Sequence, residues 1–227
     1  MAKNESYEDF IAKFNQELPK TTDDCYTPTS VFEAVKNWVR GRIGDFDYIR
    51  PFYPGGDYEH AEYPPGVLVL DNPPFSIMSK IVDFYRENHI RFFLFANALT
   101  SLNTLKNRDD VKLIVCNSNI IYTNGAKVRT GFVTNLPGFK RITVSGTLSD
   151  AIAEAQDIKR KRPASVLGNT IQNAATLLKY AKYHQDIEFD VLDITREYNG
   201  KKIFGCGCRI SEGDFERLEA LRDGKLL

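Results

Sequence analysis

The chain has 227 residues, and its 30 basic and 30 acidic side chains give a formal net charge of zero. Hydrophobic residues make up 42% of the sequence and aromatic residues 12%, which indicates a globular protein and excludes a disordered chain. The balanced charge argues against a protein coated with nucleic acid, but it allows a local basic groove. The length suffices for one α/β domain, or for a smaller domain with an appendage.

Several classes of protein are excluded by local sequence features. The first five residues contain no apolar signal core, and no apolar run approaches membrane-spanning length. We therefore expect a cytoplasmic protein that does not contact a membrane. The four cysteines are too few and too scattered for a disulfide scaffold. Cys206 and Cys208 lack the paired spacing and the further ligands of a zinc site, so we expect strand thiols and no metal.

Hydrophobic periodicity and turn signals predict helices alternating with strands in the first part of the chain. Thr27 is expected to cap a helix with Pro28 at its first position, although Ser30 and Glu33 also fit a capping box. Two strands that flank Thr123-Asn124-Gly125 indicate a hairpin. The predicted helices cover residues 7–18, 28–39 and 76–85, and the predicted strands cover 46–52, 67–71, 91–96, 111–116, 119–122 and 128–134. This order indicates a parallel sheet with an appended hairpin.

The chain changes character near residue 148. The predicted elements there are helices over 149–161 and 169–184, strands over 187–194 and 201–209, and a helix over 211–222. We therefore predict a domain over residues 1–147 and a small C-terminal α+β extension over 148–227.

Asn72-Pro73-Pro74-Phe75 is the most informative segment of the sequence. It follows a buried strand and precedes a helix, so it lies at the carboxyl end of a strand, where open α/β sheets bind ligands. The two prolines fix two φ angles and remove two N–H donors. The loop therefore offers an amide, backbone carbonyls and an aromatic ring to the amino group of a flat substrate. An ordinary turn is the alternative, but the strand-loop-helix context favours a catalytic loop.

The sequence resembles adenine-specific DNA methyltransferases, most closely the phage-type and EcoRI-type branch found in restriction-modification. Three segments carry this resemblance, with a weaker fourth at 131–136. They are Asp24-Cys25-Tyr26-Thr27-Pro28, residues 50–58 and Asp71-Asn72-Pro73-Pro74-Phe75-Ser76. The resemblance covers roughly residues 20 to 140 and implies an abbreviated Rossmann-like sheet. It also implies S-adenosyl-L-methionine as cofactor and DNA as partner.

The resemblance implies a role for each matched residue. Asn72 and the carbonyl of Pro73 would accept hydrogen bonds from the adenine amino group, Pro74 completes the motif, and Phe75 would stack on the flipped base. The amino nitrogen would then attack the methyl carbon in line with the departing sulfur and lose its proton afterwards, and positioning would dominate catalysis. The implied cofactor-binding residues are Tyr26, Thr27, Pro28, Gly55, Gly56, Asp57, Glu59 and Asp71. A helix amino terminus after Thr27 would favour the cofactor's carboxylate, and Asp57 or Glu59 would accept from its ribose or ammonium group. A plain helix cap and a turn with exposed acids are the alternatives.

The sequence also departs from the family. It has Pro54-Gly55-Gly56-Asp57 where the family usually has Gly-x-Gly, and only fourteen residues run from Tyr58 to Asp71. That interval cannot hold a further strand-helix-strand unit. A methyltransferase acting on RNA or a protein amide, and a non-catalytic nucleic-acid-binding or partner-binding remnant, therefore stay open. The basic run Lys159-Arg160-Lys161-Arg162 would contact phosphates or, alternatively, complement a helix dipole before Pro163.

Overall fold

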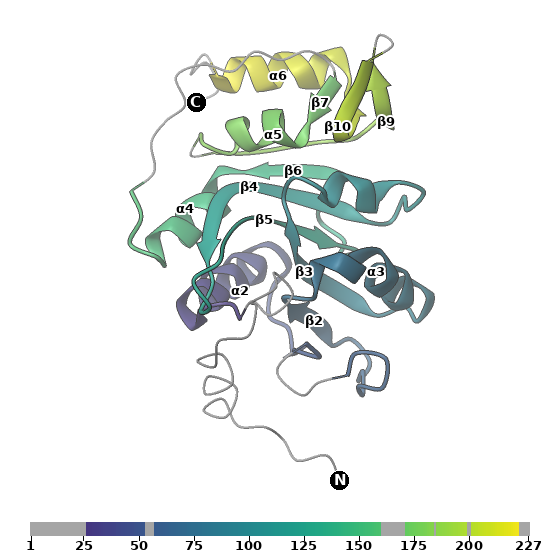
Figure 1. The fold of residues 1–227 in the computed structure, drawn as a ribbon, viewed down its shortest axis with the longest axis vertical. Helices are drawn as coiled ribbons and strands as arrows, with labels where there is room; N and C mark the ends of the chain where they lie inside the picture. Colours follow the sequence, from purple (N-terminus) through teal and green to yellow (C-terminus); the bar gives the residue numbers. More distant parts are fainter. Residues whose placement is uncertain (1–25, 53–56, 160–170, 184, 199–200, 223–227) are drawn as a thin grey trace.

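The computed structural model describes residues 26–52, 57–159, 171–183, 185–198 and 201–222. Within these residues, seven strands form one mixed sheet in the order β1-β2-β3-β5-β4-β6-β8 (Figure 1). The strands are β1 (Tyr48–Ile49), β2 (Leu68–Asp71), β3 (Arg91–Asn97), β4 (Lys112–Ile121), β5 (Lys127–Thr134), β6 (Ile142–Ser145) and β8 (Asp186–Phe189). Strands β1, β2 and β3 pair in parallel, as do β4 and β6, whereas β5 and β8 are antiparallel to their neighbours.

The predicted hairpin is confirmed as the β4–β5 pair, but its predicted position at the margin of the sheet is wrong. Strand β5 also pairs with β3, with Phe93 opposite Thr134, so it lies inside the sheet. The reason is the burial of the second half of β5, from Thr130 to Thr134, which suits a central strand. The two strands predicted over 111–116 and 119–122 form one strand, β4, whose register shifts between Ile114 and Ser118.

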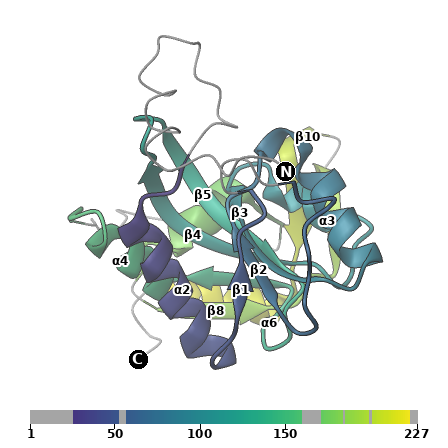
Figure 2. The ribbon, with the colours of Figure 1, turned by 90° about the horizontal axis from the view of Figure 1, so that it is seen from below.

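Helices cover both faces of the main sheet. Helices α2 (Thr29–Ile43) and α4 (Gly146–Glu154) lie on the same side in Figure 2, and α3 (Met78–Glu87) lies on the other. Successive residues of the central strands alternate between the two cores. Leu68 and Leu70 pack with the α2 side chains, while Val69 packs with the α3 side chains. The arrangement is a mixed α/β fold and is compatible with the predicted Rossmann-like class.

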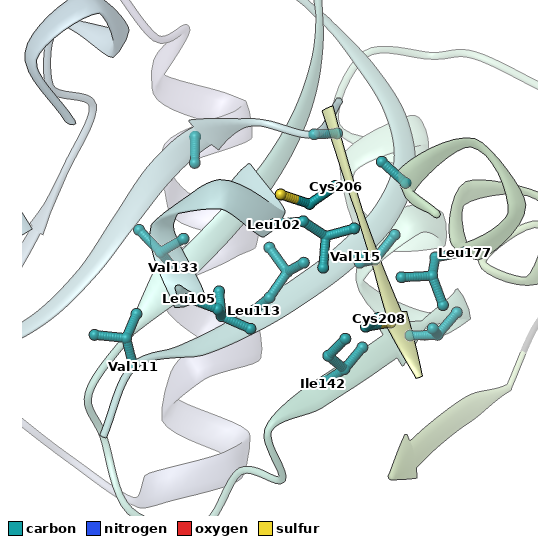
Figure 3. Packing of buried hydrophobic residues seen from close by; sticks show 14 of the residues in the cluster. Leu102, Leu105, Val111, Leu113, Val115, Val133, Ile142, Leu177, Cys206 and Cys208 are labelled. Carbon is teal, nitrogen blue, oxygen red and sulfur yellow. The ribbon is translucent and has the colours of Figure 1, made fainter. Parts of the chain in front are cut away.

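The C-terminal residues add a second sheet and two helices. These elements are β7 (Ile171–Asn173), α5 (Ala174–Tyr180), β9 (Asp193–Tyr198), β10 (Lys201–Arg209) and α6 (Glu212–Arg222), with the strand order β7-β10-β9. Their buried side chains join the core of the main sheet, as Cys206 and Cys208 do beside Leu102 and Ile142 (Figure 3). Since β8 also belongs to the main sheet, sheet and core continue across residue 147, where the sequence predicts a domain boundary.

Three predicted elements differ from the observed ones after residue 145. The helix predicted over 169–184 is β7 followed by α5, because the Asn173 side chain caps a new helix by accepting from the Thr176 N–H. Helix α4 spans 146–154 instead of 149–161, and Ser145 caps it. The strand predicted over 187–194 is divided between β8 and β9. The predictions of β10 and α6 are confirmed, and the helix predicted over 7–18 lies outside the described residues.

The thiols of Cys206 and Cys208 are buried in the core, which confirms the prediction of strand thiols. The Cys206 Sγ donates to Asn103 Oδ1 at 2.7 Å, and burial raises the pKa of Cys208 to about 12. Among the described residues, no group of three or more His, Cys, Asp or Glu side chains is placed to hold a metal ion. None of the described helices combines the length and apolarity that a membrane span requires.

Candidate functional site

The Asn72 loop lies where the sequence predicts it. Strand β2 ends at Asp71, the loop leads into a 3-10 turn over Phe75–Ile77, and α3 begins at Met78. Because β1, β2 and β3 are parallel, their carboxyl ends share one edge of the sheet with this loop. Pro73 is buried, whereas Asn72, Pro74 and Phe75 are half-buried. The Phe75 ring packs against both cores, so it combines a packing role with partial exposure.

Asp71 connects the end of β1 to the Asn72 loop. Its carboxylate is 1% exposed and accepts three hydrogen bonds, from Arg50 Nε at 3.1 Å, the Phe52 N–H at 2.8 Å and the Asn72 N–H at 2.9 Å. Burial raises the pKa of the Asp71 carboxyl, and the Arg50 charge opposes that rise. The Asp71 carboxylate thus joins Arg50 and Phe52 to Asn72, and we call these contacts the Asp71 clamp. The sequence predicts Asp71 as a cofactor ligand.

Arg50 extends this clamp to the beginning of α2. Its guanidinium carbon lies 4.1 Å from the centre of the Phe32 ring and 5.4 Å from that of the Tyr26 ring. Cation–π contacts of this kind are stronger where water is excluded, and the Arg50 side chain is 18% exposed. Arg50 therefore holds Tyr26 and α2 close to the carboxyl ends of β1 and β2. Sequence reasoning missed this role, although Arg50 lies inside the segment 50–58 that resembles the methyltransferases.

The turn after β4 contacts both predicted segments. Tyr122 is 2% exposed, and its hydroxyl donates to Asn72 Oδ1 at 3.4 Å and lies 3.3 Å from Thr130 Oγ1. The Thr123 N–H and hydroxyl donate to the Tyr26 carbonyl at 3.1 and 3.3 Å. Tyr122 thereby orients the amide oxygen of Asn72, while Thr123 positions the chain ahead of α2. The hairpin signal locates this turn, but the sequence does not indicate that it reaches Asn72.

The start of α2 differs from the prediction that Thr27 caps it. The helix begins at Thr29 with Pro28 at the N-cap, because Pro28 has the extended angles φ −54° and ψ 139°. The N-cap residue makes no side-chain capping hydrogen bond, and the first turn of the helix carries no acid. Thr27 is 1% exposed, and its hydroxyl has no hydrogen-bond partner among the described residues. A buried hydroxyl thus adjoins a helix amino terminus that its own N-cap residue does not cap, an arrangement that suits an anionic group.

Asp57 and Glu59 lie on an exposed turn and have local partners. Asp57 accepts from the Glu59 N–H at 3.0 Å and pairs with His60 Nδ1 at 2.8 Å, and the His60 hydrogen bond lowers the pKa of Asp57. Glu59 pairs with Lys80 Nζ at 3.1 Å and accepts from the Tyr58 hydroxyl at 2.9 Å, and Lys80 lowers the pKa of Glu59. Gly55 and Gly56 lie outside the described residues.

The described contacts therefore bring together five of the predicted residues or segments in one place. These are Tyr26, Thr27, Pro28, Asp71 and Asn72–Phe75, to which the structure adds Arg50, Tyr122 and Thr123. Comparisons with protein-family models, with curated proteins and with solved structures found no match to this chain.

Proposed function

We propose that the chain is an S-adenosyl-L-methionine-dependent methyltransferase that modifies the exocyclic amino group of adenine in DNA. The observation that carries this proposal is the setting of Asn72 at the carboxyl edge of parallel strands. Its amide oxygen is oriented by the Tyr122 hydroxyl, and its backbone N–H is held by the Asp71 carboxylate. One hydrogen bond thus holds the backbone of Asn72 and another holds its amide oxygen, while the residue remains half-buried, as a group that positions a substrate requires.

The loop provides acceptors for an amino group. The amide oxygen of Asn72 has two lone pairs, so it accepts from Tyr122 and from an adenine N–H at the same time. The Pro73 carbonyl is the second acceptor, and neither proline has an N–H that would compete. Two acceptors on one amino group direct its nitrogen lone pair out of the hydrogen-bonding plane. The half-buried ring of Phe75 is the stacking surface for a base flipped out of the duplex.

The residues at the start of α2 fit the methionine end of the cofactor. S-adenosyl-L-methionine, when bound, supplies an activated methyl group. The Thr27 hydroxyl and the first N–H groups of α2 would hold its carboxylate, since this hydroxyl has no partner among the described residues and the N-cap residue makes no side-chain capping hydrogen bond. The Thr123 contacts with the Tyr26 carbonyl keep this end of the chain beside the Asn72 loop. Asp57 and Glu59 remain our candidates for the ribose and ammonium groups.

A non-catalytic nucleic-acid-binding protein is the second candidate, and the interval between β1 and β2 favours it. The described residues 57–67 contain no helix or strand, and β1 pairs directly with β2. The described part of this interval therefore shows no counterpart of the additional strand that holds a ribose-binding acid in the resemblance. Isothermal titration of the chain with S-adenosyl-L-methionine, with and without DNA, separates the two candidates. Binding supports the methyltransferase, and its absence under both conditions supports the non-catalytic protein.

The class of acceptor is tested by supplying three substrates. A labelled methyl donor is incubated with the chain and with unmethylated DNA, with RNA or with a protein extract. We expect label in DNA alone. If label appeared only in RNA or only in protein, that molecule and not DNA would be the substrate. If label appeared in none of the three, under conditions where the donor binds, the result would contradict the proposed function.

Replacing Thr27 with Val is expected to weaken cofactor binding without weakening the fold. The valine has nearly the same shape and removes a buried hydroxyl that has no described partner, so the free energy of unfolding should stay within about 1 kcal/mol. A lost hydrogen bond to a charged carboxylate should raise the dissociation constant of S-adenosyl-L-methionine about tenfold or more. Titration calorimetry and urea unfolding measure the two quantities. Unchanged cofactor affinity would remove Thr27 from the cofactor site.

Replacing Tyr122 with Phe is expected to lower kcat by about three- to tenfold, since one neutral hydrogen bond orients the Asn72 amide. Tyr122 is a positioning residue, so the KM for S-adenosyl-L-methionine should not change. Steady-state kinetics with varied donor and DNA concentrations measure both constants. A three- to tenfold rise in the KM for S-adenosyl-L-methionine, with kcat unchanged, would contradict this role.

A further inference from the structure

A polar recess of about 250 Å³ lies beside the end of β4, where the chain segments following α4 and α5 meet. Its described lining contains three lysines, four neutral polar side chains and no carboxylate. The lining residues are Asn117, Ser118, Asn119, Lys127, Ala153, Gln156, Ile158, Lys159 and Lys182. The recess therefore has the composition of an anion site, in a protein whose net charge is zero.

The lysine charges of the recess are not neutralised within the described part of the chain. Lys127, Lys159 and Lys182 come from three separate segments, and none of them forms an ion pair with a described residue. Glu154 and Asp157, the acids nearest to Lys159 along the chain, are exposed and do not line the recess. Helix α4 ends at Glu154, so Lys159 does not cap its carboxyl terminus and the dipole explanation for this lysine is wrong. Arg160, Lys161 and Arg162 lie outside the described residues.

Gln156 fixes the rim of the recess to β4. Its side chain accepts from the Ile121 N–H at 2.9 Å and donates to the Asn119 carbonyl at 3.2 Å. On the inner side, Ser149 accepts from the Asn117 N–H at 3.0 Å. These bonds hold the strand that carries Asn117 and Asn119, so the polar side chains around the lysines project from a rigid framework.

The β4–β5 hairpin connects the recess to the Asn72 loop. Ile121, which Gln156 binds, immediately precedes Tyr122, which contacts Asn72. Opposite residues of a strand pair share a face, and Ile121 is paired with Lys127. The next pair on that face, Asn119 and Arg129, adds a second exposed cation. One hairpin thus carries the contact to the candidate catalytic amide and a basic face.

We propose that this recess binds a phosphate of the DNA backbone next to the base that Asn72 receives. The inference rests on the proposed function. Lysines and side-chain amides are common phosphate contacts, and such contacts set the register of the duplex without reading its sequence. The recess would therefore anchor the strand while the target base leaves the stack. Free phosphate shares this chemistry, so the experiment must separate the two sources.

The double variant Lys127→Gln with Lys182→Gln tests the recess. We expect it to weaken DNA binding about tenfold at low salt and to reduce the slope of log K against log salt by about 1, equally for different DNA sequences. The control is Lys106→Gln with Lys202→Gln, which removes the same charge from exposed lysines outside the recess. The charge-keeping variant Lys127→Arg with Lys182→Arg should retain binding. Fluorescence anisotropy without cofactor measures all four proteins.

An unchanged salt slope, or an equal loss in the control, would overturn the inference. So would inorganic phosphate that protects Lys127 and Lys182 from acetylation while DNA gives no protection. Because the binding assay contains no methyl donor, it is independent of catalysis. Lysine-dependent DNA binding without methyl transfer would support the recess and contradict the proposed function. Methyl transfer with an unchanged KM for DNA in the double variant would support the function and overturn the recess.

Discussion

Replacing Asn72 with Ala is expected to lower the rate of methyl transfer by about 10²–10³-fold. The substitution removes the amide oxygen that the Tyr122 hydroxyl orients and leaves the Pro73 carbonyl as the single acceptor of the loop. Asn72 is half-buried and lies in a loop, so the free energy of unfolding should change by less than about 1 kcal/mol. Single-turnover transfer to DNA and urea unfolding measure these effects.

Two further variants delimit the role of Asn72. Asn72→Asp keeps an oxygen acceptor and should retain part of the activity. Asn88→Ala removes an exposed asparagine side chain at the end of α3, whose amide donates to the Phe84 carbonyl, and should retain all of it. Full activity of Asn72→Ala would contradict the role of this side chain, whatever the other variants do.

Replacing Asp71 with Ala is expected to destabilise the protein by about 3–5 kcal/mol, because it removes the buried carboxylate that pairs with the largely buried Arg50 side chain. It also leaves the Phe52 and Asn72 N–H groups without their acceptor. For a protein of this size, the melting temperature should fall by roughly 6–20 °C. Urea and thermal unfolding of the two proteins measure the loss.

A double replacement separates the effect of the buried charges from the effect of the hydrogen bonds to Asp71. Asp71→Leu with Arg50→Met substitutes apolar side chains for the ion pair and should recover at least half of the lost stability, since buried pairs exchange for apolar contacts at little cost. Methyl transfer should be low in both Asp71 variants, because the Asn72 N–H lacks its Asp71 acceptor in each. A loss below about 1 kcal/mol for Asp71→Ala would contradict the clamp.

Elements with strong local signals could be predicted from the sequence. The apolar run before Asn72, the double proline and the helix after it are all local features, and the observed β2, loop and α3 follow them. The β4–β5 hairpin likewise follows from its turn residues. The place of β5 between β3 and β4 could not be predicted, because pairing such as Phe93 with Thr134 joins residues far apart in the sequence. A local pattern fixes a strand but not its neighbours.

The candidate site likewise contains residues that the sequence predicts and residues that only tertiary contacts reveal. The motif identifies Asn72–Phe75, and the resemblance identifies Tyr26–Pro28. Tyr122 and Arg50 could not be assigned, because their roles arise from contacts between distant segments. Asp71 is predicted to bind the cofactor, and its sequence position does not disclose that three internal donors bind its carboxylate.

Methylation of adenine in DNA is tested most directly by the nucleoside composition of the product. DNA incubated with the purified chain and S-adenosyl-L-methionine is hydrolysed and analysed by mass spectrometry. We expect N6-methyladenine with the native chain and its loss with Asn72→Ala. DNA without N6-methyladenine, under conditions where the chain binds both the cofactor and DNA, would contradict the proposed methylation of adenine.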